Sequence, residues 1–230
     1  MKKGIYILSV MMVALLLGSC KKNQLKKPTD VQVTMDINRS PNTEGTLEFN
    51  QGYIRIAEFT YEGTRQEGAP IELSTEFSSG LTINFLSESF VSDLMADVPQ
   101  GNYTDLKVRF DTFDDDDAPT LEVSGTYTDG TSTTYPIIFQ FMSSESFVIK
   151  GEDDDGQDII VLDKDVSAFV NVQLDPVYWF DIVSANMLDN ATKYEVNGQQ
   201  TIVINEEQNE DIYDLLADRI DESPTAIFGE

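Results

Sequence analysis

Residues 96–110 read ADVPQGNYTDLKVRF, and this stretch is the clearest guide to the fold. Pro99 and Gly101 predict a tight turn, because proline presets one backbone angle and glycine tolerates a positive one. After the turn, three apolar residues alternate with three charged ones. The apolar set is Leu106, Val108 and Phe110, and the charged set is Asp105, Lys107 and Arg109. This period of two predicts a half-buried antiparallel strand.

The same alternation recurs before and after this stretch. It is clear at 31–37 and 166–174, and it predicts a short strand beginning at Ile71, a separate strand over 81–85 and a final strand over 178–183. Asp129 and Gly130 lie between two alternating runs, which indicates a hairpin. The apolar phase shifts within 46–61, which predicts a bulge near Ala57 or Glu58.

Helical spacing is confined to two places. Residues 87–95 predict a short helix or turn, and Asn205 with Gln208 forms a capping-box pattern at the start of a helix over about 206–221. The apolar face of this second helix predicts docking on the sheet, and a partner-binding helix is the alternative. The expected fold class is all-β: an antiparallel Greek-key sandwich with a short helix and a C-terminal docking helix.

Composition excludes several kinds of function. The 230 residues include 15 Lys and Arg, 41 Asp and Glu, no His and one Cys, with a formal net charge of -26. Such a negative field repels nucleic-acid backbones. Without histidine, the commonest general base and the commonest transition-metal ligand are missing. A single cysteine, Cys20, rules out a disulfide framework.

The N-terminus carries export signals. Lys2 and Lys3 precede an apolar run from Ile5 to Leu17, and Leu17-Gly18-Ser19-Cys20 resembles the lipobox of bacterial lipoproteins. The resemblance implies a signal peptide over 1–19 and lipidation of Cys20; a plain secretory signal with an incidental cysteine is the alternative. Residues 20–30 then form a basic linker, followed by a sandwich domain over 31–183 and a C-terminal extension over 184–230.

Several features together resemble a known family. They are the lipobox, a sandwich of this length, the turn over 98–103 followed by Leu106 and Val108, and a late strand over 166–174. They resemble uncharacterised Bacteroidota lipoprotein domains with a prealbumin-like, or transthyretin-like, β-sandwich, over about residues 31–183. Fimbrial anchor lipoproteins of the same bacteria are a more distant likeness. The family carries no catalytic residues to transfer.

Two acidic turns are candidate metal sites. One holds Asp114, Asp115 and Asp116, and the other holds Asp153, Asp155 and Asp158. Calcium prefers such oxygen ligands, so structural calcium is one interpretation. The alternative is a pair of solvated turns that protect sheet edges from other chains.

Tyr178 and Trp179 are a candidate ligand site, since an exposed aromatic ring can stack on a sugar. The alternative is that Trp179 packs in the core.

No pair among the 41 acids is marked out for catalysis, so we expect no enzyme and no cofactor apart from structural calcium. The expected function is a membrane-anchored cell-envelope lipoprotein that acts as a non-enzymatic protein-interaction or scaffolding module, through sheet edges or loops. A glycan- or calcium-binding adhesion lipoprotein is the alternative. The basic linker after Cys20 favours a periplasm-facing position, and surface display stays open.

Overall fold

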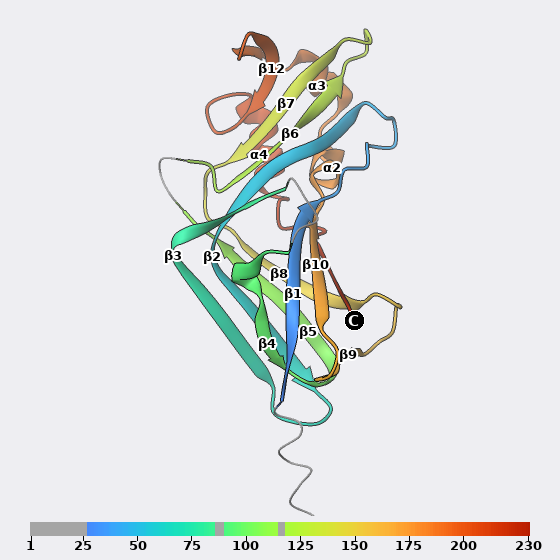
Figure 1. The fold of residues 1–230 in the computed structure, drawn as a ribbon. Helices are drawn as coiled ribbons and strands as arrows, with labels where there is room; N and C mark the ends of the chain where they lie inside the picture. The colour runs from blue at the N-terminus through green and yellow to red at the C-terminus, as the bar shows by residue number, and fades with distance from the viewer. Residues whose placement is uncertain (1–26, 86–89, 115–117) are drawn as a thin grey trace, which may run out of the picture.

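The computed structural model describes residues 27–85, 90–114 and 118–230, and the described chain is mostly β-sheet with a few short helices (Figure 1). The strands are β1 (Pro28–Ile37), β2 (Leu47–Arg65), β3 (Ile71–Asn84), β4 (Ala96–Pro99), β5 (Gly101–Thr112), β6 (Leu121–Thr128), β7 (Thr134–Phe141), β8 (Ser146–Asp153), β9 (Ile160–Leu162), β10 (Ala168–Leu174), β11 (Lys193–Val196), β12 (Gln199–Ile204) and β13 (Thr225–Gly229). The helices are η2 (Ser92–Leu94), α2 (Pro176–Trp179), η3 (Phe180–Ile182), α3 (Ala185–Asn190) and α4 (Glu210–Ala217).

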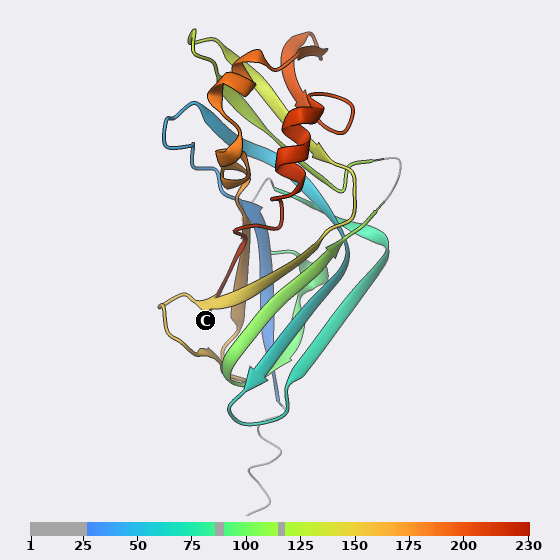
Figure 2. The ribbon, with the colours of Figure 1, turned by 180° about the vertical axis from the view of Figure 1, so that it is seen from behind.

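One long strand, β2, belongs to two regions of the molecule. Its first half pairs with β6, and the sheet continues through β7 and β12 to β11. The helices α2, α3 and α4 cover one face of this part (Figure 2). We call β6, β7, β11, β12 and residues 47–54, with these helices, the helix-covered region.

The second half of β2 pairs with β3 on one side and β5 on the other. From β5 the sheet continues through β8, β13, β10 and β1 to β4, each strand paired with the next. Two layers result, one with β3, β2 and β5 and the other with β4, β1 and β10 (Figure 1). We call this part the two-layer region.

The strand that follows the central turn is confirmed. Leu106, Val108 and Phe110 are at most 1% exposed, while Asp105, Lys107 and Arg109 are half-buried on the other face. In the turn, the Tyr103 hydroxyl donates to the Pro99 carbonyl oxygen at 2.5 Å. Burial raises the pKa of Tyr103 to about 12, against the opposing effect of Arg65, so the phenol keeps this proton at neutral pH.

Three local predictions are also confirmed. The register of β2 against β3 and β5 shifts between Ile56 and Glu58, so the bulge falls at Ala57. The strands β6 and β7 form the predicted hairpin, closed by the five-residue loop 129–133. The Asp129 carboxylate stabilises that loop by accepting from the backbone amides of Thr131 and Thr133.

The pairing directions correct the expected antiparallel sheet. Three pairs are parallel, namely β1 with β10, β7 with β12 and β8 with β13, so the sheet is mixed. Parallel partners are far apart in sequence, and alternation within a strand says nothing about the direction of its neighbour. The structure also has a single strand, β3, where the sequence predicts two, but its pairing with β2 falls into two segments, 71–76 and 81–84, with a register break between them.

The expected strand over 178–183 is wrong, because this segment forms α2 and η3. Asp175 caps α2 by accepting from the Tyr178 amide, and Pro176 occupies the first turn. An acidic cap followed by proline is a helix start, and here it overrides the run of aromatic residues.

The C-terminal helix docks as predicted but is shorter. The helix α4 begins after Asn209 and buries Ile212, Tyr213 and Leu216. Asn205 instead closes a tight turn, accepting from the amides of Glu207 and Gln208. The short helix expected over 87–95 is the single 3-10 turn η2 within the described residues.

Strand β1 begins at Pro28, inside the predicted linker, and β12 and β13 extend the sheets beyond residue 184.

In the ranges that the structure describes, no helix has the length and apolar character needed to cross a membrane.

Candidate functional site

Some of the predicted site residues lie outside the described ranges. These are Cys20, with the signal peptide before it, and Asp115 and Asp116 of the first acidic turn.

The second acidic turn is held by its own side chains. It joins β8 to β9, and the Asp153 carboxylate accepts from the amides of Asp155 and Gln157 at 3.1 and 3.2 Å. Asp114 follows the end of β5 that pairs with the start of β8, so it lies at the opposite end of β8 from Asp153. Asp114 therefore does not lie beside the second turn, and no group of three or more metal-ligating side chains occurs among the described residues.

Trp179 is not an exposed sugar platform, which corrects that interpretation. Its side chain is fully buried, and the centroid of its ring lies 6.3 Å from the ring centroid of Phe139 on β7. Tyr178 is half-buried, and the guanidinium of Arg219 lies 4.5 Å from its ring centroid. The helical backbone at Asp175 and Pro176 turns these residues inward, as the core-packing alternative expects.

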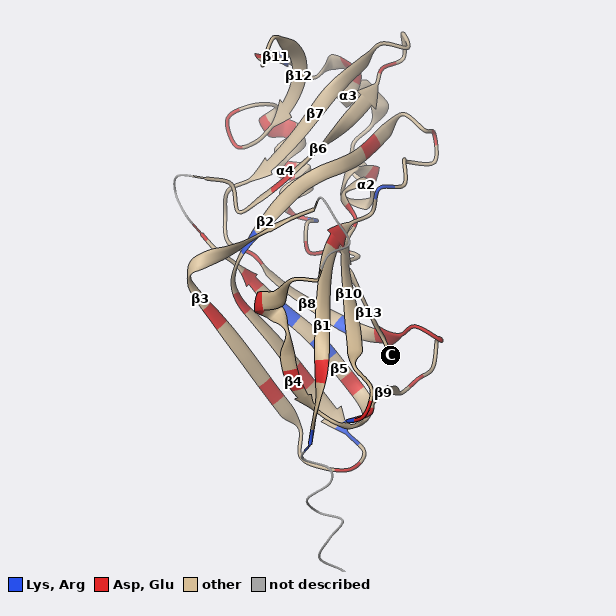
Figure 3. Ribbon diagram, viewed as in Figure 1, with Lys and Arg blue, Asp and Glu red and all other residues tan. Residues whose placement is uncertain are grey.

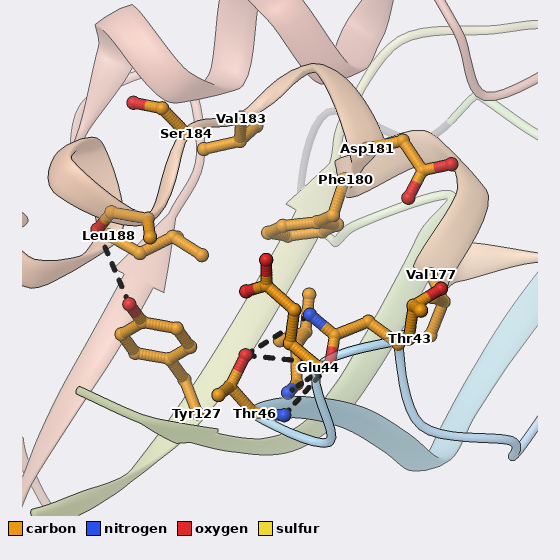
Figure 4. A pocket seen from close by; sticks show the side chains of 13 residues that line it. Thr43, Glu44, Thr46, Tyr127, Val177, Phe180, Asp181, Val183, Ser184 and Leu188 are labelled. Atoms are coloured by element: carbon orange, nitrogen blue, oxygen red, sulfur yellow. Dashed lines mark hydrogen bonds between the residues drawn. The ribbon is translucent and has the colours of Figure 1, made fainter. Parts of the chain in front are cut away.

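A pocket of about 280 Å³ lies between the loop before β2, strand β6 and the segment from α2 to α3 (Figure 4). Phe180 and Leu188 contribute apolar surface, and Glu44 and Asp181 also line the pocket, with the Glu44 carboxylate pointing toward Phe180 (Figure 4). These two acids disfavour anionic ligands in the pocket.

Tyr127 is a polar residue of this pocket, and its hydroxyl forms hydrogen bonds within the fold. The hydroxyl donates to Asp189 Oδ1 at 2.7 Å and lies 3.3 Å from the carbonyl oxygen of Ala185. Burial raises the pKa of Tyr127, and the hydrogen bond to Asp189 adds to the shift. The phenol therefore stays protonated at neutral pH and connects α3 to β6.

The most distinctive surface is the open edge of β3. Within the described residues this strand pairs with β2 alone, along one side, through residues 71–76 and 81–84, and the register breaks between them. The strand runs along the border of the two-layer region (Figures 1 and 2). The open edge over 71–76 presents a row of backbone donors and acceptors that another strand can pair with.

The two faces of β3 differ in character. Ile71, Leu73 and Phe77 are half-buried and pack against the core from the inner face. Between them, Thr75 is exposed and lies opposite Phe59 of β2. An added strand would therefore extend an apolar inner surface that at present ends at the edge.

The outer face of β3 carries Glu72 and Glu76, and the strand has no Lys or Arg (Figure 3). Glu72 lies directly opposite Glu62, and Glu76 directly opposite Glu58. Like charges in such cross-strand positions are destabilising. We call these four residues the edge acids.

Arg109 of β5 lies near only two of the edge acids, Glu58 and Glu62 on β2. Its guanidinium nitrogens lie 3.8 Å from Glu58 and 3.9 Å from Glu62, and also 3.9 Å from Asp111. No ion pair joins Glu72 or Glu76 to a cation among the described residues. The acids nearest the open edge are therefore the ones without a salt bridge.

The sequence by itself does not mark residues 71–84 as a binding site. The available signal was the absence of Lys, Arg and Pro from residues 71–84, because these residues commonly protect edge strands. That signal has meaning only once β3 is known to be an edge.

Comparisons with family models, with curated proteins and with solved structures found no match for this chain.

Proposed function

We propose that this protein is a cell-envelope lipoprotein, anchored through Cys20, that binds an extended segment of another envelope protein by strand addition along β3. The observation that carries the proposal is the open edge of β3 over residues 71–76, where Glu72 and Glu76 form no salt bridge within the described chain. Strand addition supplies affinity through backbone hydrogen bonds, and the side chains on alternate faces supply specificity.

The edge predicts the chemistry of the bound segment. Side chains on its inner face would meet Leu73 and Phe77, so apolar residues suit those positions. Side chains on its outer face would lie beside Glu72 and Glu76, so Lys or Arg suits the alternate positions. The preferred partner segment therefore alternates apolar and basic residues.

The edge acids also disfavour a second copy of this chain. Two β3 strands paired with each other would bring glutamates of both copies onto neighbouring positions, in a chain with a net charge of -26. Electrostatic complementarity thus favours a basic partner over self-association.

The finer fold and the location are part of the same proposal. Two facing β-layers and the turn at Pro99 and Gly101 support a prealbumin-like sandwich. The lipobox-like Leu17-Gly18-Ser19-Cys20 and the four lysines between residues 21 and 27 support a lipid anchor on a periplasm-facing membrane. The role is non-enzymatic scaffolding.

Site-specific photo-crosslinking of the full-length lipoprotein in cells tests the proposal. The crosslinker p-benzoylphenylalanine replaces Thr75 at the inner face of the edge, or Gln200, an exposed residue of β12, as the matched control. We expect a discrete adduct from position 75 and none from position 200. We also expect Glu72→Lys with Glu76→Lys to reduce the adduct at least about tenfold, because repulsion replaces attraction.

Several results would contradict the proposal. They are the absence of an adduct at position 75, an equal adduct from position 200, or an adduct that persists unchanged in the double variant. An adduct with twice the mass of the chain would also contradict it, because it would identify a second copy as the occupant.

A further inference from the structure

A second surface of the two-layer region lies on its other layer and has a different character. A groove of about 820 Å³ runs over the outer face of β1 and β10. Phe90 and Phe169 contribute aromatic surface, and Thr34, Asn171 and Gln173 contribute hydroxyl and amide groups. Phe90 is 54% exposed, so a large part of its ring is open to a ligand.

The groove is electrically neutral on a strongly acidic protein. The carboxylate of Asp36 and the guanidinium of Arg39, both in the lining, form a two-point ion pair at 2.5 and 2.8 Å. Arg39 also donates to the carbonyl oxygen of Phe85 at 2.6 Å, so the pair is fixed in the fold. The remaining polar groups of the lining are uncharged, which disfavours selection of an ionic ligand.

The polar groups follow the strand geometry. Thr34 lies beside Asn171 in the parallel register of β1 and β10, and its hydroxyl donates to Asn171 Oδ1 at 3.0 Å. Phe169, Asn171 and Gln173 share one face of β10, about 6.6 Å apart along the strand. An aromatic ring and two amides thus line up along the groove, and each amide can both donate and accept.

Strand addition is not available at this place. Residues 169–173 of β10 pair with β1 on one side and with β13 on the other. A ligand here has to be held by side chains on a sheet face, which distinguishes this groove from the edge of β3. This requirement disfavours an extended peptide, whose main recognition groups are in its backbone.

We infer that the groove binds an uncharged carbohydrate chain. Sugar rings present apolar C–H faces that pack on aromatic side chains, and hydroxyls that both donate and accept hydrogen bonds. Phe90 and Phe169 provide the aromatic contacts, and Asn171 and Gln173 provide the hydrogen bonds. The inference is independent of strand addition at β3.

Binding to a printed array of neutral and acidic oligosaccharides tests the inference. The protein is the labelled full chain, kept in a detergent without a sugar headgroup, and the affinity for each bound neutral oligosaccharide is then measured by calorimetry. We expect neutral oligosaccharides to bind, with an affinity that changes little with salt, because no net charge is involved.

Matched variants locate the site. Phe90→Ala and Gln173→Ala each change an exposed residue of the groove, and we expect each to weaken binding at least about tenfold. Ile182→Ala removes an equally exposed apolar residue on η3 and should leave the affinity unchanged. Glu76→Lys, at the edge of β3, should leave it unchanged as well.

No binding to any neutral oligosaccharide on the array would overturn the inference. Binding confined to charged oligosaccharides, or equal binding by the wild type and both groove variants, would overturn it too. Salt-insensitive binding of uncharged extended peptides in the groove, without sugar binding, would assign the groove to a different ligand class. None of these outcomes bears on crosslinking at position 75.

Discussion

The two halves of strand β2 have the same secondary structure and opposite surroundings. In the helix-covered region, the ring centroids of Phe49 on β2 and Phe180 on η3 lie 5.0 Å apart. The α2 and η3 turns cover the sheet there. In the two-layer region, β2 has only β3 between itself and the open edge. Aromatic side chains cover the first half. The second half lies next to β3, whose Glu72 and Glu76 form no salt bridge within the described chain.

This difference separates stability from interaction along a single strand. Large buried aromatic rings supply much of the free energy of folding, whereas surface charges contribute little. We therefore expect substitutions in the helix-covered region to change stability, and substitutions at the edge of β3 to change binding.

The largest expected effect is in the helix-covered region. Trp179→Ala removes a fully buried ring that lies beside Phe139. It should lower the free energy of unfolding by about 3–5 kcal/mol, measured by urea denaturation. Trp179→Phe is the control and should cost much less, because the indole N–H has no hydrogen-bond partner among the described residues. Equal losses in the two variants would contradict the packing explanation.

An intermediate effect is expected where β5 supports the edge acids. Arg109→Ala removes the cation that lies near Glu58, Glu62 and Asp111. The free energy of unfolding should fall by about 1 kcal/mol at low salt, because carboxylate repulsion increases. Raising the salt concentration should recover much of this loss by screening. A loss that does not depend on salt would assign the role of Arg109 to packing instead.

A smaller effect of opposite sign is expected at the edge itself. Glu76→Lys replaces the repulsion between Glu76 and Glu58 by attraction, so it should raise the free energy of unfolding by about 0.2–1 kcal/mol. The same variant should weaken the adduct at position 75. Glu207→Lys, an exposed residue after β12, controls for net charge and should leave the adduct unchanged. A Glu76→Lys protein that is less stable and still forms the full amount of adduct would contradict the expectation that the edge of β3 determines binding.

The smallest effect concerns the exposed loop between β6 and β7. Hydrogen bonds from Thr133 and Thr131 lower the pKa of Asp129 below its usual value of 3.8. A folded pKa below the unfolded one means that the contribution to stability is present above about pH 4 and is lost as the pH falls through the folded value. The carboxyl carbon resonance of Asp129 should therefore titrate at lower pH in the folded protein than in the urea-unfolded chain. Coincident midpoints would contradict these hydrogen bonds.

Much of the local structure was predictable from the sequence. Leu106, Val108 and Phe110 are buried because a strand places every second side chain on one face, and that period is visible within six residues. The bulge at Ala57 was predictable for the same reason, since a bulge shifts the phase of the alternation. The error over 178–183 arose where two local signals competed, and the Asp175 cap with Pro176 prevailed over the aromatic run.

The candidate site was less predictable. Sheet edges were expected to bind a partner, but the sequence did not identify β3 as the edge. Of the two aromatic residues singled out for a ligand, Trp179 is fully buried in the core and Tyr178 is half-buried. Burial of an aromatic ring depends on what covers it, and residues far away in the chain, such as Phe139 on β7, provide that cover.

The sequence by itself determined the period of the strands, the main hairpin, the bulge, the docking helix and the acidic, histidine-free composition, because each of these is encoded within a short run or in a simple count. Only the tertiary structure decided the three parallel pairings, the open edge of β3 and the groove over β1 and β10. The parallel pairings join residues that lie 65 or more positions apart, such as Ile137 with Ile202 and Thr34 with Asn171. Such neighbours follow from the free energy of the whole packed chain, which no local pattern contains.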